Sequence, residues 1–530
     1  MGGLPVKTGR ERKKRQMKKL LAVILMLIAV LAIVLVGCDS GQGGSIETQK
    51  QTENQTERAT ETPTAAPTDA STEPPHVCSF GDWVTVKDAT CTEDGLMERV
   101  CECGEKETQS IDASGHTVGD DGYCSMCDLP LHATEGVEYE LSLDGTYAIV
   151  KGYSGAASRI IIAEEYEGVP VQVIEFEAFK GKELTDIVIP DSVISIGENA
   201  FLGCFDITET IDGVTYVKDC VISAEKGLVQ LKLREGTRFI ADRAFAKCFN
   251  LAFVSIPDSV TSIGNSAFWE CTRLTSVVIP DSVTSIGYNA FYGCGNLTSV
   301  VIPDSVTSIA DDAFLNCGGL TSIGVDANNT NYKSIDGNLY SEDGTTLIQY
   351  AIGKTATTLA ISDNVTSIEN RAFAGCTSLT SIVIPDSVTS IADGAFLGCR
   401  NLTSVVIPDS VTSIADGAFV DCANLTSIAI PDSVTSIGDN AFFGCRNLTS
   451  VVIPDSVTSI GYEAFYNCSR LTSITIPDSV TSIGYGAFSG CKSLTTVYYT
   501  GSEEQWAEIS IDRDNSQLSN ATIIYNYKDQ

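Results

Sequence analysis

The chain repeats one pattern of apolar and polar positions many times. In the unit that begins at Leu274, apolar side chains alternate with polar ones up to Ile279, and Val283 and Ile286 follow in a second short run. Alternation with a period of two is typical of β-strands that bury one face. The sequence therefore predicts two short strands per unit. Pro280 ends the first strand, because proline has no N–H for a ladder hydrogen bond.

A third segment closes each unit. After Gly287, which permits a corner, Ala290-Phe291 and Cys294 are expected to form a short helical turn whose side chains complete the core. The unit recurs every 23 residues, as shown by Pro257, Pro280, Pro303, Pro385, Pro408, Pro431, Pro454 and Pro477. Four divergent units are aligned by Ala163, Pro190, Arg234 and Ser362. Together these units predict about 12 coils of 23 residues.

A coil that buries only one side cannot fold alone, so neighbouring coils stack at about 4.8 Å and like residues form ladders. The pattern predicts a repeat solenoid of the β-rich leucine-rich-repeat type, with short helical turns, over residues 135–497. Two inserts, near 205–233 and 325–361, are expected to be hairpins, the second turning at Asp343-Gly344. Residues 498–530 break the period and are expected to form a C-terminal cap.

Two strings within the repeat resemble those of a known family. Ile-Pro-x-Ser-Val-x-x-Ile-Gly and Ala-Phe-x-x-Cys are similar to the signatures of BspA-like, or Treponema-type, leucine-rich repeats. The resemblance covers about residues 135 to 500 and implies a solenoid on a bacterial surface. Known members of the family are associated with adhesion. The chain lacks the buried asparagine ladder of ordinary leucine-rich repeats, so their curvature cannot be transferred to it.

The N-terminus has the charge pattern of an export signal. Eight basic residues precede an unbroken apolar run from Leu20 to Val36, and positive charge stays on the cytoplasmic side of a membrane. The run ends in Leu35-Val36-Gly37-Cys38, which resembles the lipobox of bacterial lipoproteins. This resemblance implies a signal peptide over residues 1–37 and lipid attachment at Cys38. The alternative is an uncleaved signal anchor, because 17 apolar residues just reach spanning length. Both interpretations place the remaining chain on the extracellular face of the bacterial cell membrane.

A linker and a small module precede the repeats. Residues 38–75 are rich in Thr, Pro and Glu, cannot bury enough apolar surface to fold, and are predicted to be a disordered tether. Residues 76–130 form a Cys/His-rich module that resembles one found in surface proteins of anaerobic gut bacteria. Its Cys101, Cys103, Cys124 and Cys127 are candidate ligands of a structural zinc ion. The alternative is three disulfides, which form readily outside the cell. No other cofactor is expected.

Composition excludes several classes of function. The chain has 68 acidic and 34 basic residues, a formal net charge of -34. Nucleic-acid binding is therefore not expected, because phosphates require clusters of Lys and Arg. The three histidines, His76, His116 and His132, all precede the repeats, so the array has no imidazole for acid–base catalysis. The carboxylates of the array recur on one repeated edge instead of meeting in a cleft, and we predict that the protein is not an enzyme.

The variable positions of the repeat are candidates for partner binding. They flank Ala-Phe and follow the repeat cysteine, and they carry aromatic and arginine side chains, which dominate binding hot spots. The candidates are Trp269, Arg273, Tyr288, Tyr292, Arg400, Phe443, Arg446, Tyr462, Tyr466, Arg470 and Tyr485. The alternative is neutral drift, with the aromatic rings folded onto neighbouring coils. A rival surface is the stripe of outward strand positions Val278, Val301, Val383, Val406, Val452 and Thr475.

These observations lead to two hypotheses of function. The first is a lipid-anchored surface protein whose array mediates adhesion to an extracellular protein or a glycan-bearing surface. The second is a non-adhesive spacer or coat, consistent with near-identical coils and a large negative charge. Replacing the variable aromatic and arginine residues separates the two, because a spacer should lose nothing.

Overall fold

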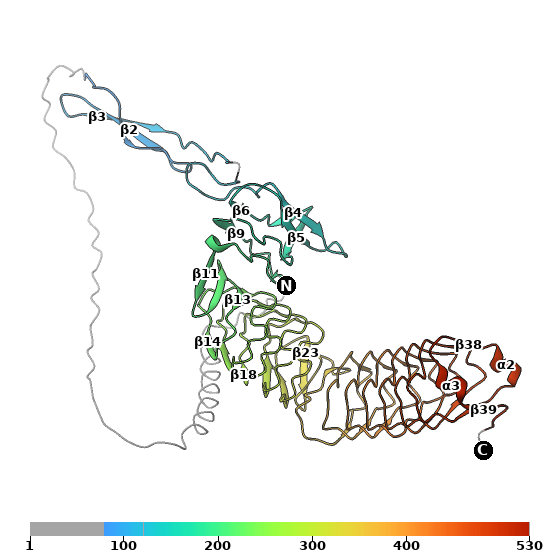
Figure 1. Cartoon of the computed structure of the whole chain (residues 1–530). Coiled ribbons are helices and arrows are strands. Elements are labelled where there is room, and N and C mark those ends of the chain that lie inside the picture. Colours follow the sequence, from blue (N-terminus) through green and yellow to red (C-terminus); the bar gives the residue numbers. More distant parts are fainter. Residues whose placement is uncertain (1–78, 120, 529–530) are drawn as a thin grey trace, which may run out of the picture. The chain divides into compact units, whose positions relative to one another are not determined.

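The computed structural model describes residues 79–119 and 121–528 (Figure 1). The predicted signal peptide, Cys38, the linker and Cys78 lie outside the described residues. Over the described part of the chain, no helix combines the length and the apolar character that crossing a membrane requires.

The central coil shows how the repeat folds. Its two strands are β18 (Ser276–Val277) and β19 (Ser285–Ile286), and Val277 and Ile286 are both buried. Between the strands, the carbonyl oxygen of Pro280 accepts a hydrogen bond from the amide of Val283 at 3.1 Å, which closes a turn. The two strands and the turn therefore form where the alternation and the proline predict them.

Stacked coils form two parallel ladders of strands. In each ladder, a residue pairs with the residue one repeat later, as Ser285 pairs with Ser308. Ladder A contains the first strand of each coil: β14 (Gln230–Lys232), β16 (Phe253–Ser255), β18, β20 (Ser299–Ile302), β22 (Ser322–Val325), β26 (Thr358–Ala360), β28 (Ser381–Val383), β30 (Ser404–Val406), β33 (Ser450–Val452), β35 (Ser473–Ile476), β37 (Thr496–Tyr499) and β39 (Thr522–Ile524). Ladder B contains the second: β15 (Phe239–Ile240), β17 (Ser262–Ile263), β19, β21 (Ser308–Ile309), β27 (Ser367–Ile368), β29 (Ser390–Ile391), β31 (Ser413–Ile414), β32 (Ser436–Ile437), β34 (Ser459–Ile460), β36 (Ser482–Ile483) and β38 (Ser510–Ile511).

The Ala-Phe segment forms consecutive turns instead of the expected helical turn. Amide-to-carbonyl hydrogen bonds join Ala290 to Gly287, and Cys294 to Phe291, at 3.1 Å each. Asn289 between them has a φ of 56°, which a right-handed helix does not permit. The side chains nevertheless point inward, because Ala290, Phe291 and Cys294 are all fully buried.

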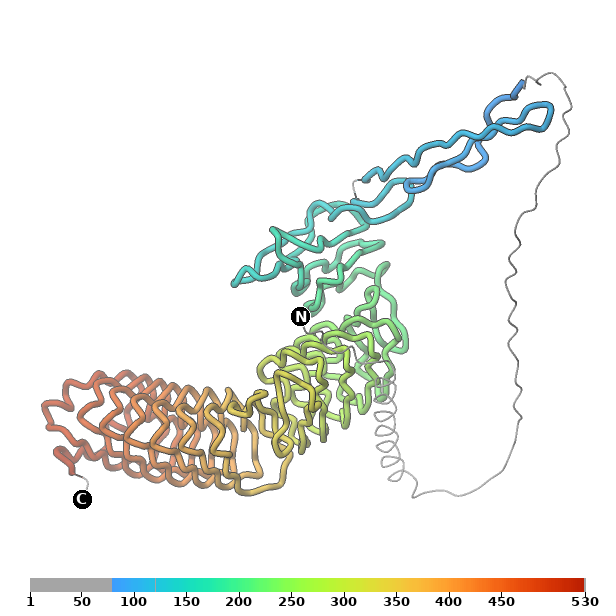
Figure 2. The backbone as a smooth tube through the Cα atoms, turned by 180° about the vertical axis from the view of Figure 1, so that it is seen from behind, coloured from blue at the N-terminus to red at the C-terminus, as the bar shows by residue number. Residues whose placement is uncertain are grey.

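Phenylalanine rings stack along the length of the core. Phe291 lies between Phe268 and Phe314, with ring centroids 5.2 and 5.6 Å away and planes within 2° of parallel. The same column continues from Phe373 to Phe488. Figure 2 shows the regular succession of coils that this stacking requires.

Each insert is a three-stranded antiparallel unit. The first contains η1 (Phe205–Ile207), β11 (Thr208–Ile211), β12 (Val214–Val217) and β13 (Cys220–Ala224), and the second contains β23 (Tyr332–Ile335), β24 (Asn338–Ser341) and β25 (Thr346–Gln349). The turn between β24 and β25 includes Asp343 and Gly344. The last strand of each insert pairs in parallel with ladder B, β13 with β15 and β25 with β27. Both inserts therefore extend the solenoid.

The solenoid has about 16 turns of about 23 residues, more than the 12 that the prolines and divergent units predict. Three of the additional coils carry β22, β37 and β39, which pair in ladder A although their sequences lack the proline signature. β37 and β39 lie in the segment expected to cap the array, together with the short helices α2 (Glu503–Ala507) and α3 (Ser516–Asn520). Ladder pairing needs only backbone groups and an inward apolar side chain, so it continues beyond the repeat consensus.

The N-terminal described residues contain further strands. The Cys/His-rich module has β1 (Val84–Lys87), β2 (Gly95–Val100) and β3 (Lys106–Ile111) in an antiparallel sheet. The first coils of the solenoid contain β4 (Val137–Leu141), β5 (Ala148–Tyr153), β6 (Arg159–Ile161), β7 (Glu165–Tyr166), β8 (Val169–Ile174), β9 (Asp186–Val188) and β10 (Ser195–Ile196). These coils bury their own cluster, which includes Phe179 and Phe201.

Candidate binding surfaces

The predicted aromatic residues lie in two columns on the turn side of the coils, here called the turn surface. Trp269, Tyr292, Phe443 and Tyr466 each follow the buried phenylalanine, and Tyr288, Tyr462 and Tyr485 each lie two positions before the buried alanine. Because each column repeats with the coil, side chains from adjacent coils become neighbours. The fold thus brings together residues that lie 23 positions apart in the sequence.

Four of these rings form two stacked pairs, here called the C-terminal aromatic patch. The ring centroids of Phe443 and Tyr466 are 4.8 Å apart with planes 10° from parallel. Those of Tyr462 and Tyr485 are 5.5 Å apart with planes at 11°. Tyr462 is 43% and Tyr485 36% exposed, so each pair is ordered by mutual contact and still presents ring surface to solvent.

The two exposed tyrosines of the patch are bound to carboxylates. The hydroxyl of Tyr485 donates a hydrogen bond to Asp514, which raises the pKa of the phenol. Hydrogen bonding to Glu463 likewise raises the pKa of Tyr462. Both phenols therefore remain neutral at physiological pH, which leaves their rings and hydroxyls available as uncharged contact groups.

A second aromatic group surrounds Trp269. Its ring lies 6.3 Å from that of Tyr292, and the Arg243 guanidinium and the Lys247 ammonium lie over it at 5.0 and 4.7 Å from its centroid. Sequence analysis did not select these two cations. They lie in a divergent unit at the variable positions flanking Ala244-Phe245, and that register was the signal that could have identified them.

The four predicted arginines also lie on the turn surface. Arg273, Arg400, Arg446 and Arg470 occupy the first or second position after a repeat cysteine, and all four are exposed. Within residues 121–528, none of them forms an ion pair with a carboxylate. Their guanidinium groups are therefore directed to solvent in a protein with a strongly negative net charge.

A ladder of amides accompanies the arginines. The Nδ2 of Asn424 donates to the Oδ1 of Asn401 at 3.3 Å, and the Nδ2 of Asn447 donates to the Oδ1 of Asn424 at 2.9 Å. In contrast to the ladder of ordinary leucine-rich repeats, these side chains are partly or fully exposed. They hold the loops of adjacent coils in register on the turn surface.

The rival valine stripe lies on ladder A, here called the strand surface. Val301 and Val406 are 57% and 55% exposed. Val383 pairs with Val406, and Val452 pairs with Thr475, on adjacent coils. The stripe is interrupted, because Gly324 follows Val301 in the ladder and the coil between Val406 and Val452 carries Ala429. Exposed apolar area on this surface is therefore divided into short segments.

The Cys/His-rich module brings together a different set of side chains from the predicted one. Cys124 and Cys127 do lie together, but they are joined by Cys91 and His116. Cys101 and Cys103 lie in the turn between β2 and β3, at the opposite end of that hairpin from Cys91. Sequence spacing favoured the four nearest cysteine pairs, whereas the hairpin returns the chain so that Cys91 meets His116.

The repeat cysteines are buried in the core, as predicted for a ladder of small apolar side chains. Burial raises the pKa of their thiols, for example to about 12 for Cys317. Low-pKa thiolates are the reactive form of cysteine, so these thiols are chemically quiet. They belong to the core and are not candidates for a site.

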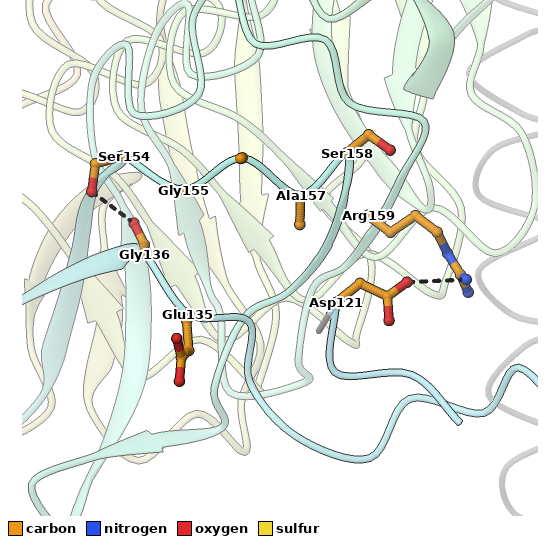
Figure 3. A pocket seen from close by; sticks show the side chains of 9 residues that line it. Asp121, Glu135, Gly136, Ser154, Gly155, Ala157, Ser158 and Arg159 are labelled. Carbon is orange, nitrogen blue, oxygen red and sulfur yellow. Dashed lines mark hydrogen bonds and ion pairs between the residues drawn. The ribbon is translucent and has the colours of Figure 1, made fainter. Parts of the chain in front are cut away.

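The cavities of the described chain are shallow and polar. One of about 700 Å³ lies at the start of the solenoid and is lined by Asp121, Glu135 and the segment 154–159. Figure 3 shows Arg159 turned toward Asp121, with which it forms an ion pair at 3.2 Å. The charged groups of this cavity thus hold the module segment against the first coils.

The repeat decides the family. The family model described as the BspA type leucine-rich repeat region matches residues 172–237, 238–360, 349–469 and 412–527. The chain belongs to this family. The BspA-type repeats account for the solenoid, its two ladders and the recurring Ala-Phe segment.

Several solved structures are similar to this BspA-type protein. A leucine-rich cell surface protein from Faecalibacterium prausnitzii is 30% identical over 72% of this chain and 97% of its own, with a TM-score of 0.44. A leucine-rich repeat protein from Bacteroides ovatus is 25% identical over 74% and 99% of the two chains, with a TM-score of 0.40. The pneumococcal vaccine antigen PcpA is 17% identical over 84% and 99%, with a TM-score of 0.45. Among curated protein sequences, none matches the chain.

Proposed function

We propose that this protein is a lipid-anchored bacterial surface protein that adheres to protein or glycan-bearing surfaces through its turn surface. The observation that carries the proposal is the C-terminal aromatic patch, in which rings from successive coils stack in pairs and remain partly exposed. The similarity to a leucine-rich cell surface protein from Faecalibacterium prausnitzii supports the surface location.

The patch has the physical properties of a contact surface. Stacking on a neighbour restricts each ring before any partner arrives, so little side-chain entropy is lost on binding. Tyrosine offers an apolar ring together with a hydroxyl, and both protein side chains and sugar rings pack on such faces. The exposed arginines after the cysteines add cationic groups at the same level of the repeat. Weak contacts on several coils gain strength through effective concentration.

The binding test uses cells that display the full chain. We expect them to bind immobilised mucin, a collagen matrix or intact bacteria more strongly than cells that lack it. Replacing Phe443, Tyr462, Tyr466 and Tyr485 by serine should abolish most of this gain. The matched control replaces four exposed valines of the strand surface, Val301, Val383, Val406 and Val452, by serine and should retain it. Equal surface display is verified with an antibody.

Each outcome of this test has a defined meaning. If displaying cells bind no better than cells without the protein on all three probes, adhesion is rejected and the spacer hypothesis is favoured. The net charge of -34 then serves to repel other surfaces. If the valine variant loses binding and the aromatic variant does not, the strand surface is the adhesive one.

Lipid anchoring at Cys38 is part of the same proposal and is tested separately. Cells expressing the protein are supplied with a labelled fatty acid. We expect the label to enter the protein and to be lost in Cys38→Ala, with the protein then accumulating in the unprocessed form. Label that persists in Cys38→Ala contradicts attachment at this residue.

A further inference from the structure

We propose that Cys91, His116, Cys124 and Cys127 form a structural zinc site in the Cys/His-rich module. Their four ligand atoms all lie within 4.8 Å of one another. This set differs from the cysteine pairs that spacing alone selects, and it is independent of the proposed adhesive surface. The argument rests on the geometry, on the scaffold that produces it and on the electrostatics of the thiols.

The geometry matches tetrahedral coordination. Zinc binds thiolate sulfur at about 2.3 Å and imidazole nitrogen at about 2.0 Å, so neighbouring ligand atoms in a tetrahedron lie roughly 3.5 to 3.8 Å apart. The Sγ atoms of Cys91 and Cys124 are 3.5 Å apart. The Sγ of Cys127 is 3.4 Å from the Nδ1 of His116. Three thiolates and one imidazole complete a closed structural site without an open position for catalysis.

Backbone hydrogen bonds bring the four ligands together from three segments. The β2–β3 hairpin aligns Gly95 with Ile111, and beyond its end the amide of Ser114 donates to the carbonyl of Thr90 at 3.0 Å. This contact places the segment of Cys91 beside that of His116. The amide of Ser125 donates to the carbonyl of Thr117 at 2.9 Å, which adds the Cys-x-x-Cys loop. The site is therefore built by the module and does not depend on flexible side chains alone.

The electrostatics of the thiols also suit a bound cation. Backbone amides of Cys127 and Met126 donate to the sulfur of Cys124 and lower its pKa to about 5. Burial, together with the nearby sulfurs of Cys124 and Cys127, raises the pKa of Cys91 to about 12. Bringing three thiolates this close is unfavourable unless a positive charge lies between them. Zinc would displace the remaining thiol protons to solvent and hold all three sulfurs as thiolates.

A zinc ion here would also fix the contact between the module and the solenoid. The Cys-x-x-Cys loop is followed by Asp128, whose carboxylate binds the Arg159 guanidinium at 2.6 Å. Arg159 also lies 3.7 Å from the ring centroid of Tyr123, and the Tyr123 hydroxyl donates to Asp186 at 3.3 Å. The loop that carries two ligands thus contacts the first coils. Loss of the metal is expected to loosen this end of the array.

The test measures metal in the full chain, purified in detergent with zinc in the growth medium. Metal analysis should give one zinc per chain, and replacement by Co²⁺ should produce the thiolate charge-transfer and tetrahedral d–d absorption bands. Cys124→Ser and Cys91→Ser should each lower bound zinc at least tenfold. The matched control, Cys101→Ser with Cys103→Ser, should retain it. His116→Cys should retain zinc as well, because four cysteines also satisfy the ion.

Other results would overturn the proposal. Mass mapping of unreduced protein that finds a disulfide between Cys91 and Cys124 or Cys127, with no zinc, assigns these residues to the disulfide alternative. Zinc that is lost in the Cys101/Cys103 variant but kept in Cys91→Ser assigns the metal to another set. Circular dichroism of the solenoid identifies variants that fail to fold. The cobalt spectrum of the wild-type chain decides the question without any variant.

Discussion

The thiol of Cys422 donates a hydrogen bond to the carbonyl oxygen of Phe396 in the preceding coil, with 3.2 Å between sulfur and oxygen. The same carbonyl accepts the amide of Cys399 at 3.1 Å, so both of its lone pairs are used. Equivalent thiol bonds join Cys294 to Phe268 and Cys445 to Phe419. The repeat cysteine is therefore a small buried donor that links each coil to the one before it.

This burial predicts that the ladder thiols resist modification in the folded protein. Iodoacetamide reacts with exposed thiolates, and Cys422 is fully buried with a pKa well above its usual value because of burial. We expect mass spectrometry to find alkylation at the exposed Cys103 under native conditions, and at Cys422 only after denaturation. Native alkylation of Cys422 at a rate similar to that of Cys103 would contradict its position in the core.

The raised thiol pKa values predict that the array loses stability at alkaline pH. Burial raises the pKa of Cys317 from 9.0 to about 12, so the unfolded chain releases this proton first as the pH rises. Stability is therefore complete below pH 9.0 and falls above it, by about tenfold in the folding equilibrium per pH unit for each such thiol. Urea unfolding below and above pH 9.0 measures the loss. Cys317→Ala should reduce the slope, and an unchanged slope would contradict the assignment.

Stacking in the core predicts a large cost for removing one ring. Phe291 is fully buried between two parallel rings, and Phe291→Ala leaves a cavity that rigid neighbours cannot fill. We expect a loss of about 3 to 5 kcal/mol in the free energy of unfolding, measured by urea titration. Phe205→Ala is the matched control, because Phe205 is 84% exposed and should change stability little. Similar effects of the two substitutions would place Phe291 outside the core.

The period of 23 residues was sufficient to predict the solenoid and its core. Phe291 and Cys294 recur in register, and a residue type that recurs at the closed side of a coil has to stack on its copies. The coils of β37 and β39 were missed because Tyr499 and Ile523 replace the expected consensus. Backbone pairing continues there without the side-chain pattern on which the sequence prediction relied.

The candidate sites were less predictable, because they depend on contacts between distant segments. The columns of Tyr462 and Tyr485 follow from the repeat, but their stacking required side-chain orientation on adjacent coils. Cys91 and His116 lie outside any repeated register, and only the hairpin between them determines that they meet. Local spacing favoured Cys101 and Cys103 for the same reason that it fails for any site closed by a long turn.

A ladder of carboxylates on the turn surface leads to the last prediction. The Oδ1 of Asp416 accepts the amide of Asp439 at 2.8 Å, and the Oδ1 of Asp439 accepts the amide of Tyr462. In other coils, an asparagine has the same role, since Asn265 accepts the amide of Tyr288 at 2.9 Å. The side chain of one coil therefore satisfies a backbone donor of the next, and an amide oxygen serves as well as a carboxylate.

We accordingly expect Asp416→Ala to lower the free energy of unfolding by about 1 kcal/mol, the net worth of one hydrogen bond, and Asp416→Asn to stay close to the wild type. The control is Asp432→Ala, which removes an exposed carboxylate after Pro431 and the same negative charge. Urea titrations of the three variants separate the two causes. If Asp416→Asn and Asp432→Ala both match Asp416→Ala, the effect comes from charge, because like charges stack along the array, and the ladder of backbone contacts contributes nothing measurable.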